Sequence, residues 1–563
     1  MSSNAMRVNI LARCSWATLV LIAICTFAVD ARADVRILDG HFKVVTVVRD
    51  TTVFAGANGA TIGSDGALYI VHTGDGTTTR IDLRTFRATE FVHPWAGAFV
   101  PDDITSDGKG AFYETGTTPV VGEVYKIDAA GRKRVIARGL TAPNGIQFNK
   151  KTGRLFVSEC FQANRVFEID PTGAREPRLI VGADTIAVPE GFDFDPDTAD
   201  LIIPDFGSGR ILRVNPDSGA IQPIAAGFAG PIALKVGPDN QAYIPEIGGA
   251  VYRMSLDGLV REKLAQLPPG EDNLAITDDG RLFVTSAWDA TVYEVATDGS
   301  GAFRTLFPKG ANTLTGVLVK NGQVIASDAI MFRIAERGGF TQTRLNVFTL
   351  AGMPLPLGVS DGPGDQIVWP DPINNAVALG NLRDGTFQPI AGGLGRPVAV
   401  VMSKKEPKLY IAEYSAGQVT ELSLASGASR PLVTGLDGPV ALAIVGDALY
   451  IAEARSPRIR RAPLAGGASE VFVSSDVGKV GALASDGKGG LIALDVIGRR
   501  LLRIDPAKLA ITTIAEGLPV RSGGVVGSGS PAVEFSAPMF VTADGDIYLV
   551  TEGRGVIELK ATK

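Results

Sequence analysis

A phrase of roughly 40 residues recurs along almost the whole chain, and this repeat limits the possible folds more than any other feature. Each copy holds an apolar strand, a turn with Asp-Gly or a similar pair, a strand such as Leu-Tyr-Ile, an acidic loop and two further strands. The strands are short, rich in Val, Ile, Leu and Tyr, and show no helical periodicity. Clear copies are ATIGSDGALYIVHTGDGTTTRIDL (60–83), GIQFNKKTGRLFVSECFQANRVFEID (145–170), LAITDDGRLFVTSAWDATVYEV (274–295), KLYIAEYSAGQVTEL (408–422) and ALYIAEARSPRIRRA (448–462). The repeat predicts an all-β chain whose units are four-stranded antiparallel blades of a β-propeller.

The number of repeats indicates how many rings they form. Six units lie between residues 53 and 295, and six more lie between 312 and 560. Propellers carry about four to eight blades, so we expect two six-bladed β-propellers in tandem rather than one ring of twelve. The first propeller is expected within 34–300 and the second within 301–563, with the boundary at 297–301.

Each half also begins with a lone outer-strand sequence. These are Phe42 to Val48 (FKVVTVV) and Phe303 to Phe307 (FRTLF), and the chain ends near Ile557 in a third strand without a fourth. We expect each lone strand to complete the last blade of its own half, because that closes both rings and leaves no exposed sheet edge.

The N-terminus has the pattern of a cleavable secretory signal. Arg7 and Arg13 precede an apolar stretch from Trp16 to Val29, which ends in Ala31-Arg32-Ala33 before Asp34. We therefore expect residues 1–33 to be removed near Ala33-Asp34 and the mature protein to be periplasmic or secreted. The alternative is a retained membrane anchor, but the stretch falls short of the roughly 20 apolar residues that span a bilayer.

Charge and cysteine content exclude further classes. The net charge is -6 and there is no long basic run, so a nucleic-acid partner is not expected. Signal cleavage removes Cys14 and Cys25 and leaves Cys160 alone, so no internal disulfide can form. After cleavage we expect no stable membrane insertion.

The loops that lead into the innermost strands should converge on the propeller axis, and in the first half they are polar. The residues aligned there are amides and carboxylates with one exception: Asn58, Asp102, Asn144, Glu190, Pro231 and Asp272, with Asn273 adjacent. The alignment leaves Asp102 against Asp103, and Asp272 against Asn273, undecided by one residue. In the second half the aligned residues lack any carboxylate: Thr315, Leu355-Pro356, Pro397, Pro439, Gly481 and Ala537.

Three carboxylates around one axis repel one another unless they are protonated or bind a cation. Hard oxygen ligands favour Ca²⁺, with Mg²⁺ or Mn²⁺ next. We therefore expect Asn58, Asp102, Asn144, Glu190, Asp272 and Asn273 to hold a metal. The alternative is that these groups only end the strands and hydrate a water-filled channel.

A family resemblance appears in the third repeat, in APNGI (142–146), LFVSE (155–159) and NRV (164–166). These phrases resemble the six-bladed propellers that include regucalcin, gluconolactonase and luciferin-regenerating enzyme, with paraoxonases, a bacterial phosphotriesterase and strictosidine synthase as relatives. The resemblance covers about 43–296. It implies a channel Ca²⁺ held by Glu, Asn and Asp side chains, with one Asp as base or nucleophile. Asn144 matches a family ligand, and Asp272-Asn273 resembles the acid–amide pair of the paraoxonase branch.

The chain also departs from that family pattern. The family's glutamate ligand belongs at the first blade, where this chain has Asn58, and its second asparagine is Glu190 here. The fifth blade offers Pro231. The charge around the implied metal is therefore altered.

Other candidates lie in loops expected on the same face. His72 and His93 could act as general acid or base there, against the alternative of ordinary loop histidines. Four aromatic residues could form an apolar, substrate-binding mouth beside His93, or could simply pack between blades: Trp95, Phe161, Phe206 and Trp288. Acids such as Glu159 and Asp205 recur in both halves, so we expect each to accept hydrogen bonds from backbone N–H groups of its own tight loop.

The leading functional hypothesis is a Ca²⁺-dependent hydrolase acting on a lactone or related ester, with a small-molecule substrate. Asp272 would activate water, helped by His72, while the metal polarises the carbonyl. Two alternatives stay open: a non-enzymatic binding or scaffold protein, and a lyase or isomerase on the same metal site. The second propeller is expected to act as a scaffold, a lid or a surface for a protein partner.

Overall fold

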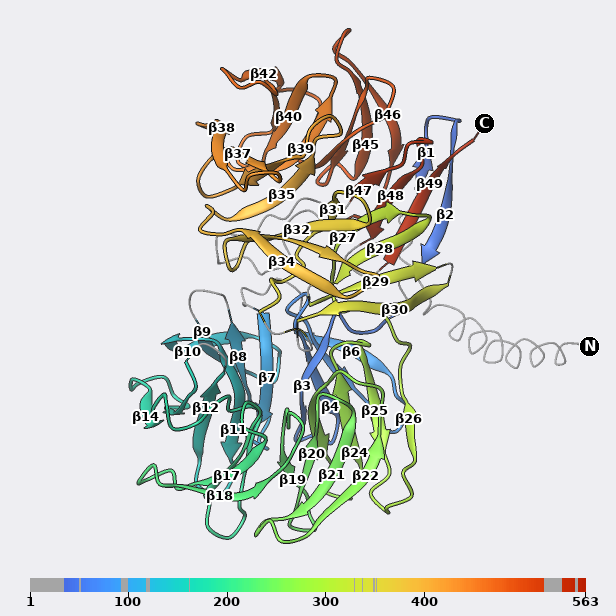
Figure 1. The fold of residues 1–563 in the computed structure, drawn as a ribbon. Helices are drawn as coiled ribbons and strands as arrows, with labels where there is room; N and C mark the ends of the chain where they lie inside the picture. Colours follow the sequence, from blue (N-terminus) through green and yellow to red (C-terminus); the bar gives the residue numbers. More distant parts are fainter. Residues whose placement is uncertain are drawn as a thin grey trace, which may run out of the picture.

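The computed structural model describes residues 35–49, 52–92, 100–117, 122–160, 163–328, 330–336, 338–347, 350, 352–520, 539–551 and 555–562. These residues form twelve antiparallel sheets, eleven with four strands and one with five, and the predicted all-β propeller fold is confirmed (Figure 1). Within these ranges no helix is long and apolar enough to cross a membrane. The predicted signal at 1–33 lies outside the described residues.

Six sheets form the first propeller, each from four consecutive strands with the innermost strand first. Their strands are β3 Ala57–Ile62, β4 Leu68–His72, β5 Thr78–Ile81 and β6 Ala88–Val92; β7 Val100–Ser106, β8 Phe112–Thr117, β9 Gly122–Ile127 and β10 Lys133–Leu140; β11 Pro143–Asn149, β12 Arg154–Glu159, β13 Arg165–Ile169 and β14 Arg178–Val181; β15 Asp193–Phe194, β16 Leu201–Asp205, β17 Arg210–Val214 and β18 Ile221–Ala226; β19 Lys235–Val236, β20 Gln241–Pro245, β21 Ala250–Ser255 and β22 Arg261–Gln266; β23 Glu271–Ile276, β24 Leu282–Ser286, β25 Thr291–Val295 and β26 Phe303–Thr305.

The other six sheets form the second propeller. Their strands are β27 Leu314–Lys320, β28 Gln323–Asp328, β29 Met331–Glu336 and β30 Gly339–Asn346; β31 Ser360–Asp361, β32 Gln366–Asp371, β33 Ala376–Asn381 and β34 Thr386–Ala391; β35 Pro397–Met402, β36 Lys408–Glu413, β37 Gln418–Ser423 and β38 Ser429–Val433; β39 Pro439–Val445, β40 Ala448–Glu453, β41 Arg458–Pro463 and β42 Glu470–Val473; β43 Val480–Ser485, β44 Leu491–Asp495, β45 Arg500–Asp505 and β46 Ala510–Glu516 with β1 Arg36–Ile37 added; and β47 Met539–Val541, β48 Ile547–Thr551 and β49 Gly555–Ala561 with β2 Phe42–Val48.

Each ring closes on itself, so the prediction of two rings of six blades holds. In the first ring, the innermost strand β23 of the last blade lies beside β3 of the first blade. In the second ring, β27 lies beside β47 and β48. Tight packing between neighbouring blades fills each ring with Val, Ile, Leu and Tyr side chains, which excludes water from the strands.

The strands that complete the last blades are exchanged relative to the sequence prediction. β2 pairs with β49, from Phe42 opposite Ala561 to Val48 opposite Val556, so the N-terminal strand closes the second propeller (Figure 1). β26 pairs with β25, from Phe303 opposite Val295, so it closes the first. The prediction that each lone strand joins its own half was wrong. Residues 36–48 belong with the second ring and 303–305 with the first, which corrects the limits 34–300 and 301–563.

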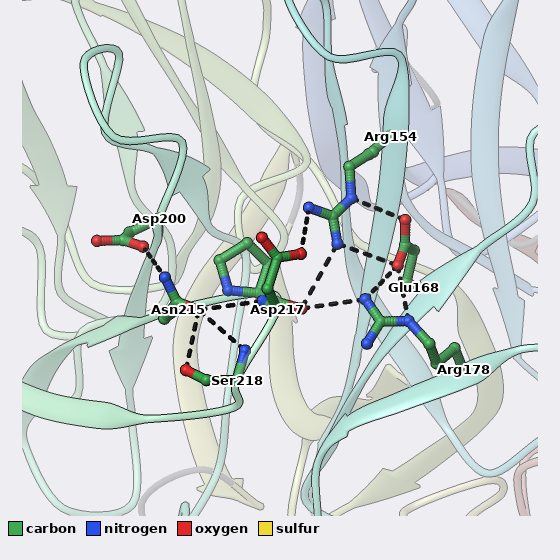
Figure 2. Close-up of polar contacts among 8 residues, drawn as sticks. Arg154, Glu168, Arg178, Asp200, Asn215, Asp217 and Ser218 are labelled. Carbon is green, nitrogen blue, oxygen red and sulfur yellow. Dashed lines mark hydrogen bonds and ion pairs between the residues drawn. The ribbon is translucent and has the colours of Figure 1, made fainter.

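Ion pairs between side chains link two neighbouring blades of the first propeller. Arg154 of β12 donates two hydrogen bonds to Glu168 of β13 and one, of 3.0 Å, to Asp217 in the turn of the next blade (Figure 2). Arg178 donates to Glu168 and to the Pro216 carbonyl. The two guanidinium groups lower the pKa of the Glu168 carboxyl through hydrogen bonds first and charge second.

The two propellers touch where the last blade of the first meets the first blade of the second. Trp288, after β24, packs against Met331 at the start of β29. Arg333 donates a hydrogen bond to the Trp288 carbonyl, and the Gly310 N–H donates one of 2.8 Å to the Asp289 carbonyl.

Candidate axial site of the first propeller

The innermost strands of the first propeller bulge just after they begin. In β11, Pro143 pairs with Glu159 but the next pair is Ile146 with Val157, so Asn144 and Gly145 share one partner position. The same shift occurs in β3, β7 and β23. A bulge leaves an extra residue unpaired and bends the strand, which turns side chains away from the ordinary pleat. The residue that follows the first pair therefore stands where the loop enters the innermost strand, near the propeller axis. We call it the inlet residue of its blade.

Hydroxyl groups of the second strands hold these bulges in place. The Asp103 N–H donates 3.0 Å to the Thr115 hydroxyl, and that hydroxyl donates 2.6 Å to the Asn144 carbonyl of the next blade. Ser158 repeats the arrangement: it accepts from the Gly145 N–H at 3.0 Å and donates to the Glu190 carbonyl at 3.2 Å. These relays satisfy N–H groups that the bulge leaves without a sheet partner, and they link consecutive blades. Sequence reasoning did not single out these hydroxyls, although each stands in the same place in its repeat.

The inlet side chains form a ring of acids and amides. Asn58 donates 2.9 Å from Nδ2 to Asp102 Oδ1, which ties the first blade to the second. Burial raises the pKa of Asp102 to about 7, with the charge of Asp103 adding to the rise. Burial likewise raises the pKa of Glu190 and of Asp272 well above the ordinary range, and the charge of Asp102 adds to both. The carboxyl groups of Asp102, Glu190 and Asp272 thus lie close enough for the charge of one to raise the pKa of another.

The residues one position further along form a second layer rather than part of the ring. Asn273 donates 2.9 Å from Nδ2 to Asp103 Oδ1, joining blades that flank the first blade. Asp103 also accepts from the Ile104 and Ile146 N–H groups, and the Asn273 amide oxygen accepts from the Leu274 N–H. These bonds decide the one-residue ambiguity: Asp102 and Asp272 occupy the ring, and Asp103 and Asn273 support it. The predicted ligand Asn273 therefore has a bracing role.

Blade five carries an apolar side chain at the inlet. Pro231 pairs with Glu246 and so corresponds to Pro143 and Pro189, the strand-opening residues. The inlet residue is Ile232, one position later than the sequence alignment placed it. In the second propeller Pro397 and Pro439 are displaced in the same way, and the inlet residues there are Val398 and Val440. The contrast between a first ring with carboxylates and a second ring without them holds at the described positions, where the second ring keeps one polar inlet residue, Thr315. Ala537 lies outside the described residues.

His72 occupies a different position from the ring. It pairs with Ala57 at the end of β4, where later blades carry Glu159, Asp205 and Glu246. Those carboxylates accept hydrogen bonds from backbone N–H groups of the loop that leads into their own blade, as from Thr141 to Glu159 at 2.6 Å. The expectation that these acids bind backbone N–H groups is confirmed, but the donors lie in the inlet loop and not, as predicted, in the tight loop that holds each acid.

The imidazole of His72 makes the same kind of contact as those carboxylates. Nδ1 accepts from the Ala55 N–H at 3.4 Å, and Nε2 bonds the Thr79 hydroxyl at 3.0 Å. The ring is buried edge-on to Phe54, and Asp75 lies 3.5 Å from Nδ1. None of these contacts joins His72 to an axial carboxylate, and its predicted acid–base role stays a prediction. His72 clamps the inlet loop of blade one.

The aromatic mouth predicted from sequence is not assembled by the described residues. Trp288 is 9% exposed and packs between the propellers, against the Met331 side chain and Gly270. Phe206 lies in its loop against Gly230. His93, Trp95 and Phe161 lie outside the described residues. Cys160 is buried beside the ring, and burial, with the charges of Glu190 and Asp102, raises the pKa of its thiol, which disfavours the nucleophilic thiolate.

A further acid next to the ring escaped the sequence analysis. Glu271 opens β23, where other blades have Pro or Ala, and its side chain is fully buried. Neither carboxyl oxygen has a hydrogen-bond partner among the described residues, and burial raises its pKa to about 8. The one sequence signal for Glu271 is that an acid stands where the other blades have Pro or Ala.

The ring suits a hard cation in its donor chemistry. Glu190 is 2% exposed, and its Oε1 has no hydrogen-bond partner among the described residues. Among those same residues, no three His, Cys, Asp or Glu side chains form a ready-made metal cluster. A cation at the axis would therefore need amide oxygens of Asn58 and Asn144 beside the carboxylates, which is a donor mixture that Ca²⁺ accepts.

Comparisons with known proteins add little beyond the propeller fold. No family model matches the chain, and no curated protein matches it. A gluconolactonase candidate of known structure is 15% identical with a TM-score of 0.37, over 49% of this chain and 99% of that chain. Virginiamycin B lyase from Staphylococcus aureus is 14% identical with a TM-score of 0.29, over 59% of this chain and 94% of that chain. A chain of the nidogen/laminin complex is 19% identical with a TM-score of 0.34, over 38% of this chain and 81% of that chain.

Proposed function

We propose that the axial ring of the first propeller binds a divalent cation, Ca²⁺ in preference to Mg²⁺ or Mn²⁺, and hydrolyses a lactone or related ester. The observation that carries this proposal is the buried Oε1 of Glu190, which has no hydrogen-bond partner among the described residues and lies in a ring where Asp102 and Asp272 oppose its ionisation. Such acids must either hold protons or share a cation. Oxygen donors alone favour Ca²⁺.

The side chains of the ring would have different roles in cation binding and proton transfer. When bound, the cation would polarise a carbonyl oxygen and stabilise the negative charge that develops on it. Asn58 holds the Asp102 carboxylate by its amide N–H, while Glu190 and Asn144 would complete the oxygen set. Asp272 accepts no hydrogen bond among the described residues, so its carboxylate is available to take a proton from an attacking water. His72 has no part in this proposal.

Metal binding is tested first, on the mature protein after chelation and dialysis. We expect calorimetry to give one Ca²⁺ per chain. Glu190→Gln and Asp272→Asn should each weaken binding at least about tenfold, because each removes a carboxylate ligand. Asp447→Asn, at an exposed surface ion pair, is the matched control and should bind as the wild type does. Zero stoichiometry would favour a non-enzymatic binding protein instead.

Hydrolysis is tested on a panel of lactones and esters with product analysis. We expect chelation to abolish turnover and Ca²⁺ to restore it, and Asp272→Asn to lower kcat by about 10²–10⁴-fold, the usual contribution of a general base. Full activity in that variant would contradict the mechanism. Products formed by elimination or isomerisation would assign the same site to a lyase or isomerase.

The cellular location and the partners that we propose follow the sequence expectations. We propose export of the chain by residues 1–33 to the periplasm or the exterior, without stable membrane insertion afterwards and without a nucleic-acid partner. The second propeller, whose described inlet residues include no carboxylate, would serve as a scaffold or as a surface for a protein partner. Mass spectrometry of the natively exported protein would show whether its N-terminus is Asp34.

A further inference from the structure

A second polar cavity lies at the far end of the innermost strands of the first propeller. It has a volume of about 740 Å³, and its walls include Thr61, Gln147, Asp193, Lys235 and Ala275. Each of these residues stands three positions after the inlet residue of its blade, one strand length away from the axial ring. Turns that follow the innermost strands, such as 277–279, form the rim. A volume of this size is typical of small-molecule sites.

The layer of Asp103 and Asn273 separates this cavity from the axial ring. These two side chains bond each other across the channel, and Asp103 also bonds the Ile146 N–H. A methyl group added at Gly59 would lie 2.8 Å from Asp103 Oδ1, and one at Gly191 would lie 3.4 Å from Asn273 Nδ2. The side chains of Asp103 and Asn273 therefore lie between the ring residues and the cavity-lining residues along the innermost strands, and we treat the cavity as a separate site.

Lys235 brings a buried positive charge into the cavity wall. It is 6% exposed, and its Nζ donates to two neutral oxygens: Gln147 Oε1 at 3.0 Å and the Phe192 carbonyl at 3.4 Å. Among the described residues it forms no ion pair. A buried ammonium is costly unless a negative charge approaches it. Burial raises the pKa of Asp103 and the charge of Lys235 opposes that rise, but among the described residues neither Asp103 nor Asp193 accepts a hydrogen bond from the Lys235 ammonium.

Those acids are occupied by backbone and amide N–H groups. Asp193 accepts from the Phe194 N–H at 2.8 Å, the Val236 N–H at 2.9 Å and Gln147 Nε2 at 2.9 Å. Asp103 is held by Ile104, Ile146 and Asn273. The third N–H of the Lys235 ammonium is thus left for a partner inside the cavity.

We propose that this cavity binds a small hydroxylated organic anion, whose carboxylate or phosphate oxygen accepts a charge-assisted hydrogen bond from Lys235. Thr61 and Ser64 offer hydroxyl groups to the ligand's own hydroxyls, and Ile62 and Leu83 offer apolar contact. Lys150 and Arg281 also line the cavity, and so do the acids Asp193, Asp278 and Asp279. The buried Lys235, rather than the net charge of the wall, therefore selects the anion. The proposal is independent of the cation and of hydrolysis at the axial ring.

Ligand-observed NMR titration of the mature protein tests the site with three probes of one size. Glycerate carries a carboxylate, glycerol 3-phosphate carries a phosphate, and glycerol carries no charge. We expect at least one anion to bind saturably and glycerol to bind much more weakly. The preferred anion identifies the source of the negative charge. Absence of binding by both anions, or equal binding of glycerol, overturns the proposal.

Variants then place the bound anion. Lys235→Met should weaken binding at least about tenfold, as expected for a lost charge-assisted bond, and Lys235→Arg should retain it. Lys109→Met, at an exposed lysine of a neighbouring turn outside the cavity lining, is the matched control. If Lys235→Met does not fold, Thr61→Asp adds a negative charge to the wall while Lys235 stays, and should also weaken binding. Wild-type affinity in a folded Lys235→Met or Thr61→Asp protein overturns the proposal, and Asp272→Asn should leave binding unchanged.

Discussion

Different side chains can have the same structural role at one position of the repeat. Where the second strand ends, Glu159, Asp205 and Glu246 each accept hydrogen bonds from backbone N–H groups of an inlet loop. In blade one the same position is His72, which accepts the Ala55 N–H through Nδ1. An imidazole and a carboxylate can replace one another here because the loop needs only a buried acceptor.

This equivalence predicts the effect of removing the imidazole. His72→Ala leaves the Ala55 N–H and the Thr79 hydroxyl without partners and opens a cavity beside Phe54, so we expect a loss of about 2–4 kcal/mol in the free energy of unfolding. Denaturant unfolding measures this loss. Ca²⁺ affinity and turnover per folded molecule should stay at wild-type values.

The matched variant is Glu159→Ala, which removes the clamp of blade three. It should be destabilised to a similar degree and should also keep its Ca²⁺ affinity. If His72→Ala instead unfolds like the wild type but loses turnover, His72 reaches the substrate and the clamp assignment is wrong.

The ring residues could be predicted because the repeat aligns them. One position of the repeat carries carboxylates in the first half and none in the second, and this contrast predicted a candidate site. The residues there in the first half are Asn58, Asp102, Asn144, Glu190 and Asp272. The position of Pro231 was missed by one residue because a bulge inserts a residue without any signal in composition. Lys235 and Glu271 were missed because their significance depends on burial, which arises only when six blades meet.

At the scale of strands, the closing of the two rings was the feature that sequence could not decide. FKVVTVV and FRTLF are both plausible outer strands, so their composition allows either exchange. The structure selects the local pairing for β26, which follows β25 through a short turn closed by the Ala296 N–H and the Ala302 carbonyl at 2.9 Å. Neighbouring strands in sequence usually pair, and this leaves β49 for β2.

Deleting the N-terminal strand should therefore damage the distant half of the chain. Removal of residues 35–49 from the mature protein exposes the edge of β49, so we expect faster hydrogen exchange in 555–561 and a tendency to aggregate. The amides of β23 and β24 in the first propeller should keep their protection. Mass spectrometry of hydrogen exchange measures both regions in one experiment.

A synthetic peptide of residues 35–50 provides the control for that deletion. Added to the shortened protein, it should restore protection at β49, whereas a peptide with the same residues in scrambled order should not. Unchanged exchange at β49 after the deletion, or damage confined to the first propeller, would contradict the pairing.

At the scale of the whole molecule, the chain crosses between the propellers twice. It leaves the second propeller after β2, builds the entire first propeller, and returns after β26. The return crossing is held at the junction, where the Gly310 N–H donates 2.8 Å to the Asp289 carbonyl and Arg333 of the second propeller donates to the Trp288 carbonyl. With the Trp288–Met331 contact, these links couple the two rings near the first blade of the second propeller.

The axial acids give this assembly a stability that depends on pH. In the metal-free protein the pKa of Asp102 is raised from 3.8 to about 7, and that of Glu271 from 4.5 to about 8, in both cases chiefly by burial. A raised carboxyl pKa means that the folded state holds a proton that the unfolded state has already lost. This contribution to stability is complete below about pH 4, and it is lost as the pH rises through 7 and 8.

The chelated protein should accordingly melt several degrees higher at pH 5 than at pH 8.5, while Ca²⁺ should raise the melting temperature more at pH 8.5 than at pH 5. The reason is that ionised Asp102, Glu190 and Asp272 repel one another without a cation and bind one when it is present. Differential scanning calorimetry at both pH values, with chelator and with Ca²⁺, measures the four cases. Asp102→Asn removes one titrating group, so it should narrow the difference between the chelated proteins at pH 5 and pH 8.5. If the chelated wild type is as stable at pH 8.5 as at pH 5, burial and mutual repulsion do not raise the pKa values of the ring acids, and the prediction is wrong.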